Sequence, residues 1–230
     1  MDQIWNGLQE AYVLIVSLES TVIAAARRSL WISTIAVGLA TVFGLPLGVF
    51  LARASFPGNL LLVWIFRAGM ALPTVFLGLV CFAAFSRQGP LGPLDLLYTP
   101  WAIVLGEFVL AAPIIVSITH GAVKSLDPRI GETASTLGAG ALRRCRTYLS
   151  EARTGVILAI LTAFARCVTE LGIAMMVGGN IKGQTRTLAT ATALETTRGH
   201  FGRGMAMGII LLFLALVAMM AIVSVSREDK

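Results

Sequence analysis

Charged residues are scarce in this chain: only 13% of its 230 residues are Asp, Glu, Lys or Arg, whereas 57% are hydrophobic. A soluble domain of this length needs a polar surface, and soluble domains typically carry about 25% charged residues. The composition therefore excludes a soluble globular domain and indicates a membrane protein that crosses the bilayer several times.

Cysteine and histidine are also rare. Cys81 and Cys167 lie in apolar runs and Cys145 lies in a basic connection, so no disulfide framework or metal-binding spacing is present. His120 and His200 are isolated, and no grouping of serine, histidine and acid supports a hydrolase. The nucleotide-binding motif G-x-x-x-x-G-K-[ST] is absent as well. We expect no enzyme activity and no bound cofactor or metal in this chain, and any use of ATP to require a partner subunit.

Long apolar runs make up most of the sequence. A transmembrane helix needs about 20 mostly apolar residues. These runs are continuous rather than alternating, which favours helices over barrel strands. The sequence predicts an all-α membrane protein with about five transmembrane helices. The candidate spans are Leu30–Ala52, Leu60–Phe85, Trp101–Gly121, Val156–Val177 and Met205–Val225.

The N-terminal segment, residues 1–29, differs from these runs. Four polar residues interrupt its apolar stretch, which ends at Arg27 and Arg28. This pattern favours an interfacial segment over a sixth span, and it lacks the order of a cleavable signal. Residues 30–230 are expected to form one transmembrane domain. Counting lysines and arginines puts the basic connection near residues 122–155 inside, although several arginines then fall outside, where they either handle an anion or contact lipid headgroups.

The basic connection contains the segment ETASTLGAG, Glu132–Gly140. Glu132, Ala134 and Gly138 fit the E-x-A-x(3)-G core of the cytoplasmic coupling loop of ABC importer permeases, which this segment resembles. The family's I-x-L-P ending is missing, since Tyr148–Glu151 occupies that region. An ordinary surface helix is the alternative interpretation. The resemblance implies that Glu132, Ala134, Leu137 and Gly138 dock on an ATPase subunit.

A second polar region begins at Arg166. Arg166 and Glu170 are four residues apart, so they share one face of a helix. Because charge in hydrocarbon is costly, both are expected to face the interior of the assembly, as a functional pair or as an ion pair that only fixes the helix. After Gly178 and Gly179 the chain supplies hydroxyl, amide and guanidinium groups, which bind oxyanions.

The region MMVGGNIKGQTRTLATATALE resembles the corresponding part of tungstate permeases and, more loosely, molybdate permeases. The passages GLPLG, ALPTVFLGL, GPLGPLDLLYTP and ETASTLGA agree with that group. The resemblance implies a type I ABC importer permease of a bacterial or archaeal cytoplasmic membrane. Its partners would be a second copy, two ATPase subunits that bind the ATP, an extracytoplasmic oxyanion-binding protein and membrane lipid, with no nucleic acid. The expected substrate path comprises Pro73, Thr74, Arg166, Thr169, Glu170, Asn180, Thr185, Arg186 and Thr187.

Glu107 departs from this pattern, because an uncharged polar residue, commonly glutamine, is expected there in tungstate-type proteins. A buried carboxylate must be protonated or paired. One hypothesis pairs Glu107 with Arg166 or Arg67 of the same or a facing subunit. The alternative is a neutral carboxyl that is hydrogen-bonded like the glutamine it replaces.

Other function classes stay open on sequence alone. A secondary transporter or channel could use Glu107, Arg166 and Glu170 as a proton or ion relay without ATP. A structural subunit of another membrane complex explains the hydrophobicity but not the GGNIKGQTRT cluster. Within the ABC class, molybdate or sulfate could replace tungstate, because tetrahedral dianions present similar charge and shape to hydrogen-bond donors.

Overall fold

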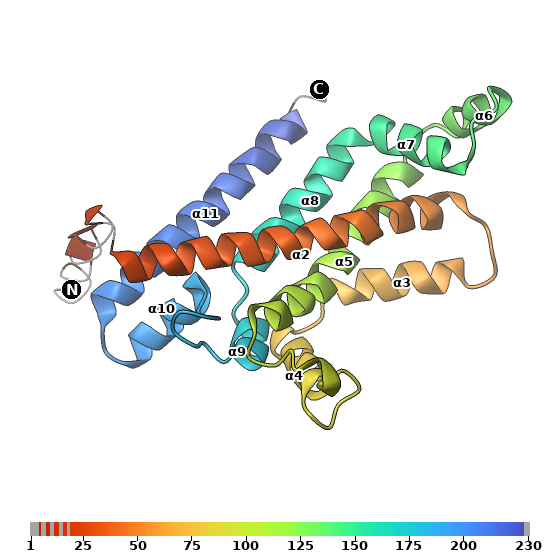
Figure 1. Ribbon diagram of the computed structural model, residues 1–230. Coiled ribbons are helices and arrows are strands. Elements are labelled where there is room, and N and C mark those ends of the chain that lie inside the picture. Colours follow the sequence, from red (N-terminus) through yellow and green to blue (C-terminus); the bar gives the residue numbers. More distant parts are fainter. Residues whose placement is uncertain (1–4, 6–7, 10–11, 14–15, 18, 228–230) are drawn as a thin grey trace. The chain divides into compact units, whose positions relative to one another are not determined.

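The computed structural model describes residues 5, 8, 9, 12, 13, 16, 17 and 19–227 (Figure 1). Every regular element in this part of the chain is a helix. Much of the predicted interfacial segment lies outside the described residues. The elements are α2 (Ser20–Arg53), α3 (Asn59–Gly69), α4 (Thr74–Phe85), η1 (Gly92–Leu94), α5 (Pro100–Lys124), α6 (Arg129–Thr136), α7 (Ala141–Glu151), α8 (Arg153–Val168), α9 (Gly172–Gly178), α10 (Leu188–Thr197) and α11 (Phe201–Arg227).

Two helices, α2 and α5, are each long and apolar enough to cross a membrane. The pairs α3 with α4 and α8 with α9 add two more candidates if each interrupted pair is one span, so length and composition give two to four spans within the described residues. The first of these spans begins at Ser20 rather than at Leu30. In α11, Phe201–Val217 is a shorter apolar helix.

The predicted spans Leu60–Phe85 and Val156–Val177 are wrong as continuous helices. The first is interrupted between Gly69 and Thr74, where Pro73 has an extended ψ of 123° and stands at the N-terminus of α4. Proline disfavours helical backbone in the residue before it and cannot donate a backbone hydrogen bond. The second is interrupted between Val168 and Gly172, and there the Glu170 Oε1 accepts a hydrogen bond from the Ile173 N–H at 3.1 Å.

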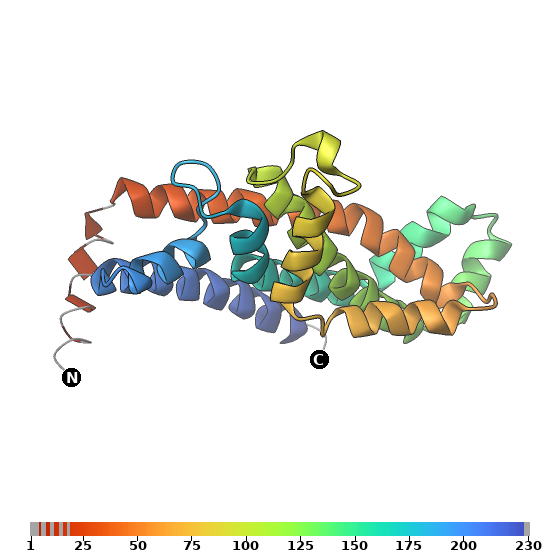
Figure 2. The same ribbon diagram turned by 90° about the horizontal axis from the view of Figure 1, so that it is seen from below.

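The described residues form two compact units. The first comprises residues 1–36, 73–107 and 165–217. In this unit α4 and α9 lie side by side (Figure 2). A Cβ at Gly78 would lie 3.1 Å from the Gly172 carbonyl oxygen, so a larger residue would force the two helices slightly apart. A core cluster joins α2, α10 and α11 through Val22, Ala25, Leu188, Ala191 and Met207.

The second unit comprises residues 37–72, 108–164 and 218–230. In this unit α2 and α5 pack closely at Gly48. A Cβ at this position would lie only 2.8 Å from the Thr119 Cβ, so a larger residue would push the helices apart. One core cluster contains Leu51, Val63 and Val116. Another contains Val49, Ala52, Val123 and Ala152, and Cys145, Tyr148 and Leu149 of α7 pack against it. These contacts anchor α7 on the ends of the long helices.

Candidate functional site

The segment predicted to dock on an ATPase forms α6 and the turn after it. No residue of α6 or α7 is buried. Glu132 is exposed, and Leu137 is 79% exposed. Gly138 has a φ of 74°, a left-handed conformation that ends the helix and turns the chain toward α7. The segment thus presents an apolar side chain and a carboxylate at the surface.

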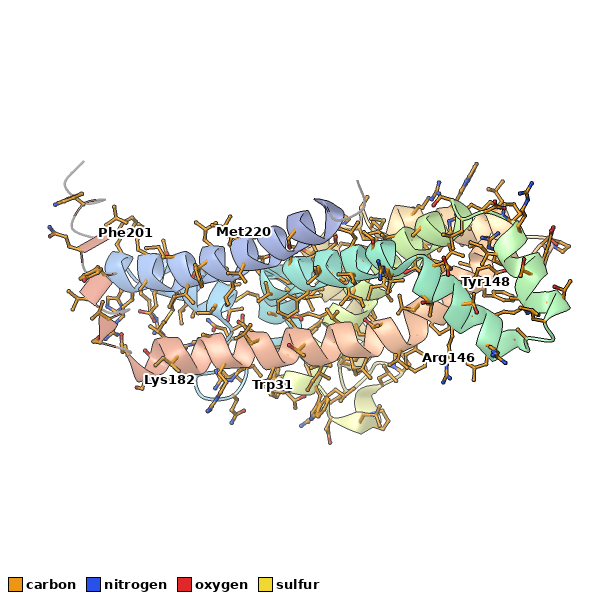
Figure 3. All side chains as sticks on the ribbon, turned by 90° about the horizontal axis from the view of Figure 1, so that it is seen from above. Trp31, Arg146, Tyr148, Lys182, Phe201 and Met220 are labelled. Carbon is orange, nitrogen blue, oxygen red and sulfur yellow. The ribbon has the colours of Figure 1, made fainter. Side chains whose placement is uncertain are left out.

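A pocket of about 470 Å³ lies at α6 and α7, and its lining includes Ile130, Ala134 and Leu137. Arg144 of α7 donates a hydrogen bond to the Ser135 hydroxyl of α6 at 3.3 Å. Tyr148 and Arg146 also lie on α7 (Figure 3). Exposed apolar groups rimmed by polar ones mark interaction surfaces. This part of the chain is therefore suited to receive a protein partner.

The charged residues at the break between α8 and α9 form the predicted pair. Arg166 Nη1 lies 3.0 Å from Glu170 Oε2. The Glu170 side chain is 1% exposed, whereas that of Arg166 is 42% exposed. The carboxylate therefore lies inside the unit and holds a guanidinium that still reaches the surface. Thr169 donates its hydroxyl hydrogen bond to the Ala165 carbonyl at 3.0 Å.

The start of α4 lies next to this pair. A Cβ built on Gly172 would be 3.0 Å from the Val75 backbone nitrogen and 3.2 Å from Glu170 Oε1. Pro73 and Thr74 directly precede Val75, so the structure places this part of the predicted path beside Glu170. Pro73 is exposed and Thr74 is half-buried.

Glu107 does not pair with Arg166 in this chain, and that part of the pairing hypothesis is wrong. Arg166 binds Glu170 instead. Glu107 is 2% exposed and has Ser33 as a side-chain hydrogen-bond partner. Its Oε2 atom has no hydrogen-bond partner within the described structure. The Cys167 thiol donates to the Glu107 backbone carbonyl, with sulfur and oxygen 3.7 Å apart.

The remaining predicted path residues form a second cluster, in the loop between α9 and α10. The Thr185 hydroxyl is buried, donates to the Gly178 carbonyl at 2.5 Å and accepts from the Ile181 N–H at 2.9 Å. Arg186 Nε donates to Asn180 Oδ1 at 3.2 Å.

Thr187 stands at the N-cap of α10. Its Oγ1 accepts from the Thr190 N–H at 3.3 Å, and the Thr190 Oγ1 accepts from the Thr187 N–H at 2.9 Å. In this conformation the hydroxyl and amide groups of the loop are used to fold the loop itself. Their contact with an anion stays a prediction.

Sequence reasoning missed the residues that hold this loop. Arg28 of α2 donates from Nη1 to the Arg186 carbonyl at 2.7 Å and from Nη2 to the Gly183 carbonyl at 3.0 Å. The neighbouring Ser29 hydroxyl accepts from the Leu188 N–H at 2.8 Å. The loop accordingly runs beside the N-terminal half of α2, where Lys182 and Trp31 are labelled in Figure 3.

The described residues contain no cluster suited to bind a metal ion. Within the described ranges, no group of three or more His, Cys, Asp or Glu side chains is placed to hold a metal ion. The polar groups identified above form hydrogen bonds and ion pairs, and those of α6 are exposed.

Known transport proteins are similar to this chain in sequence and in fold. The chain is 32% identical over 228 residues to the tungstate uptake system permease protein TupB of Peptoclostridium acidaminophilum, covering 99% of this chain and 100% of that protein. It is 34% identical over 215 residues to TupB of Campylobacter jejuni, covering 94% and 90%. The inward-facing MetNI methionine ABC transporter has the same fold, with a TM-score of 0.73 at 19% identity, covering 93% of this chain and 98% of that one. Residues 44–227 match the family described as the binding-protein-dependent transport system inner membrane component, and the chain belongs to this family.

Proposed function

We propose that this chain is the permease subunit of an ATP-driven importer of tungstate. The similarity to a tungstate uptake permease over 99% of the chain carries this proposal. The permease forms the translocation path as a homodimer, receives the oxyanion from an extracytoplasmic binding protein and is driven by two ATPase subunits that bind the ATP. The chain itself has no enzymatic role.

The ATPase docks on α6 and its following turn. Leu137 seats in an apolar recess of the ATPase, because a leucine that is 79% exposed gains most from burial against a partner. Glu132 pairs with a basic group at the rim. Gly138 turns the chain so that α7 returns to the membrane helices.

The oxyanion passes Arg166 and the start of α4. Glu170 reduces the net charge that the anion meets at Arg166, because the two groups are 3.0 Å apart. A path that conducts must release its ion as well as admit it, so a partly neutralised guanidinium suits transport better than a free one. Molybdate and sulfate are the natural competitors, since all three are tetrahedral dianions.

The test is ATP-dependent uptake of labelled tungstate into vesicles that contain this chain, its ATPase and its binding protein. Wild type is compared with Glu132→Lys, and Glu151→Lys serves as a control that makes the same charge change at another exposed position. We expect uptake to be lost in the first variant and retained in the second, with molybdate and sulfate competing less well than unlabelled tungstate.

Two results would contradict the proposal. Uptake that persists without ATP would favour an ion relay through the intramembrane acids. Uptake in which sulfate or molybdate competes better than tungstate would keep the importer and change its substrate.

A further inference from the structure

An apolar groove of about 670 Å³ runs along the N-terminal half of α2. Its walls include Ile23, Leu30 and Ile35 of α2 and Ile210 of α11. The exposed surface of this groove is almost entirely apolar. Within a membrane, such a groove matches the hydrocarbon chain of a lipid.

A smaller pocket of about 380 Å³ adjoins the groove and has a different character. It is lined by Arg27, Arg28, Tyr98 and Gln184, among others, and has about as much polar as apolar surface. Arg27 and Trp31 line both the pocket and the groove. The two spaces are therefore neighbours, one apolar and one basic.

The position of Arg27 along α2 matches a membrane interface. Arg27 lies about two helical turns from the N-terminal end of α2, which begins at Ser20. Trp31 packs edge-on against Trp101, and tryptophan and tyrosine are enriched at this depth.

Among the described residues, no carboxylate neutralises these two arginines. Arg28 donates to two backbone carbonyls, which are neutral acceptors. Arg27 is exposed, and neither arginine forms a salt bridge with any carboxylate in the described part of the chain. Guanidinium groups bind phosphate through paired hydrogen bonds. A ligand for this site has to supply negative charge at the pocket and hydrocarbon in the groove.

We propose that the N-terminal half of α2 binds one anionic phospholipid, with its phosphate at Arg27 and an acyl chain in the groove that ends at Ile35. The lipid lies at the membrane interface, at the depth of Trp31 and Trp101. It covers the loop that Arg28 holds, so its binding stabilises the segment from Gly183 to Arg186. The site includes neither Arg166 nor the start of α4, and lipid binding there does not depend on the transported substrate.

Native mass spectrometry tests this site on the full-length chain purified in detergent with the subunits that copurify. Phosphatidylglycerol and phosphatidylcholine with identical acyl chains are titrated separately. We expect phosphatidylglycerol to bind more tightly to wild type. Arg27→Gln should weaken that binding about fivefold, since one basic residue near a lipid surface contributes roughly 1 kcal/mol.

Two further variants separate charge from shape. Arg198→Gln makes the same charge change at an exposed arginine outside both spaces and should bind lipid like wild type. Thr34→Trp places a large side chain in the groove at an exposed position and should weaken the binding of both lipids.

Three outcomes would overturn the proposal. Equal affinity for the two lipids would show that Arg27 does not select an anionic headgroup. Displacement of phosphatidylglycerol by millimolar inorganic phosphate, with no effect of Thr34→Trp, would make the pocket a site for a free oxyanion. A change of oligomeric state in Thr34→Trp, with no lipid retained by wild type, would show that a second copy of the chain covers the groove.

Discussion

The guanidinium carbon of Arg53 lies 4.6 Å from the centre of the Tyr148 ring. The same guanidinium donates to the carbonyls of Val123 and Leu126, at 3.0 and 3.3 Å. One side chain thus joins the end of α2, the end of α5 and α7. A partner that moved α7 would therefore act on both long helices through Arg53.

Replacing Tyr148 with leucine should reduce uptake per ATP hydrolysed about two- to fivefold, because it removes a cation–π contact of about 0.5–1 kcal/mol. ATP hydrolysis by the assembled complex should persist, since the docking segment itself is unchanged. Tyr148→Phe keeps the ring and should behave like wild type. Parallel assays of uptake and hydrolysis in the same vesicles measure this ratio. An equal loss of both activities would argue that Tyr148 only supports assembly.

Gly131 of α6 faces the other end of the same tyrosine. A Cβ at position 131 would collide with the Tyr148 hydroxyl. Gly131→Ala should therefore displace α6 and impair ATP-coupled uptake. Adding Tyr148→Phe removes the hydroxyl and should restore much of that uptake. The double variant is compared with each single variant, and a double variant no better than Gly131→Ala would contradict this contact.

Glu170 has two separable functions, as the ion-pair partner of Arg166 and as the acceptor for the Ile173 N–H. Glu170→Gln retains an acceptor oxygen, whereas Glu170→Ala leaves a buried donor unsatisfied, at a cost of about 1–3 kcal/mol. We expect the alanine variant to melt at a clearly lower temperature than the glutamine variant in detergent. Equal melting temperatures would mean that the hydrogen bond to α9 contributes nothing measurable.

Substitutions at Thr187 can distinguish a role as a helix cap from a role as an anion ligand. Thr187→Ala should destabilise the protein by about 1 kcal/mol, the usual effect of losing an N-cap hydroxyl. Thr187→Ser keeps the hydroxyl and should restore both thermal stability and uptake. Melting curves and tungstate uptake are measured on the same preparations. A variant Thr187→Ala with wild-type stability but no uptake would instead support direct contact between Thr187 and the anion.

The sequence predicted the helical membrane fold and the Arg166–Glu170 pair, because both depend on local pattern. Hydropathy detects an apolar run, and a spacing of four places two side chains on one helical face. The interruptions at Pro73 and Glu170 were missed as helix breaks because the runs stay apolar on both sides of them. Hydropathy reports burial in lipid and does not report the backbone conformation.

The hydrogen bonds of Arg28 could not be predicted from the sequence pattern. Its acceptors are backbone carbonyls near Gly183 and Arg186, and every residue type provides a carbonyl. No residue signature therefore indicates the partner. Glu107 is similar: its Oε2 has no hydrogen-bond partner among the described residues, and the sequence reveals the buried carboxyl but not its neighbours.

The hydrogen bonds that Arg28 donates to the loop before α10, and the one that Ser29 accepts from Leu188, can form only late in biosynthesis. Their partners, from Gly183 to Leu188, are made long after α2 has left the ribosome, since synthesis runs from the N-terminus at about 5–20 residues per second. Until then the Arg28 guanidinium of the newly inserted α2 has none of these acceptors. These contacts of α2 form only when the last quarter of the chain is being made, so truncations that remove this loop leave Arg28 and Ser29 without these partners.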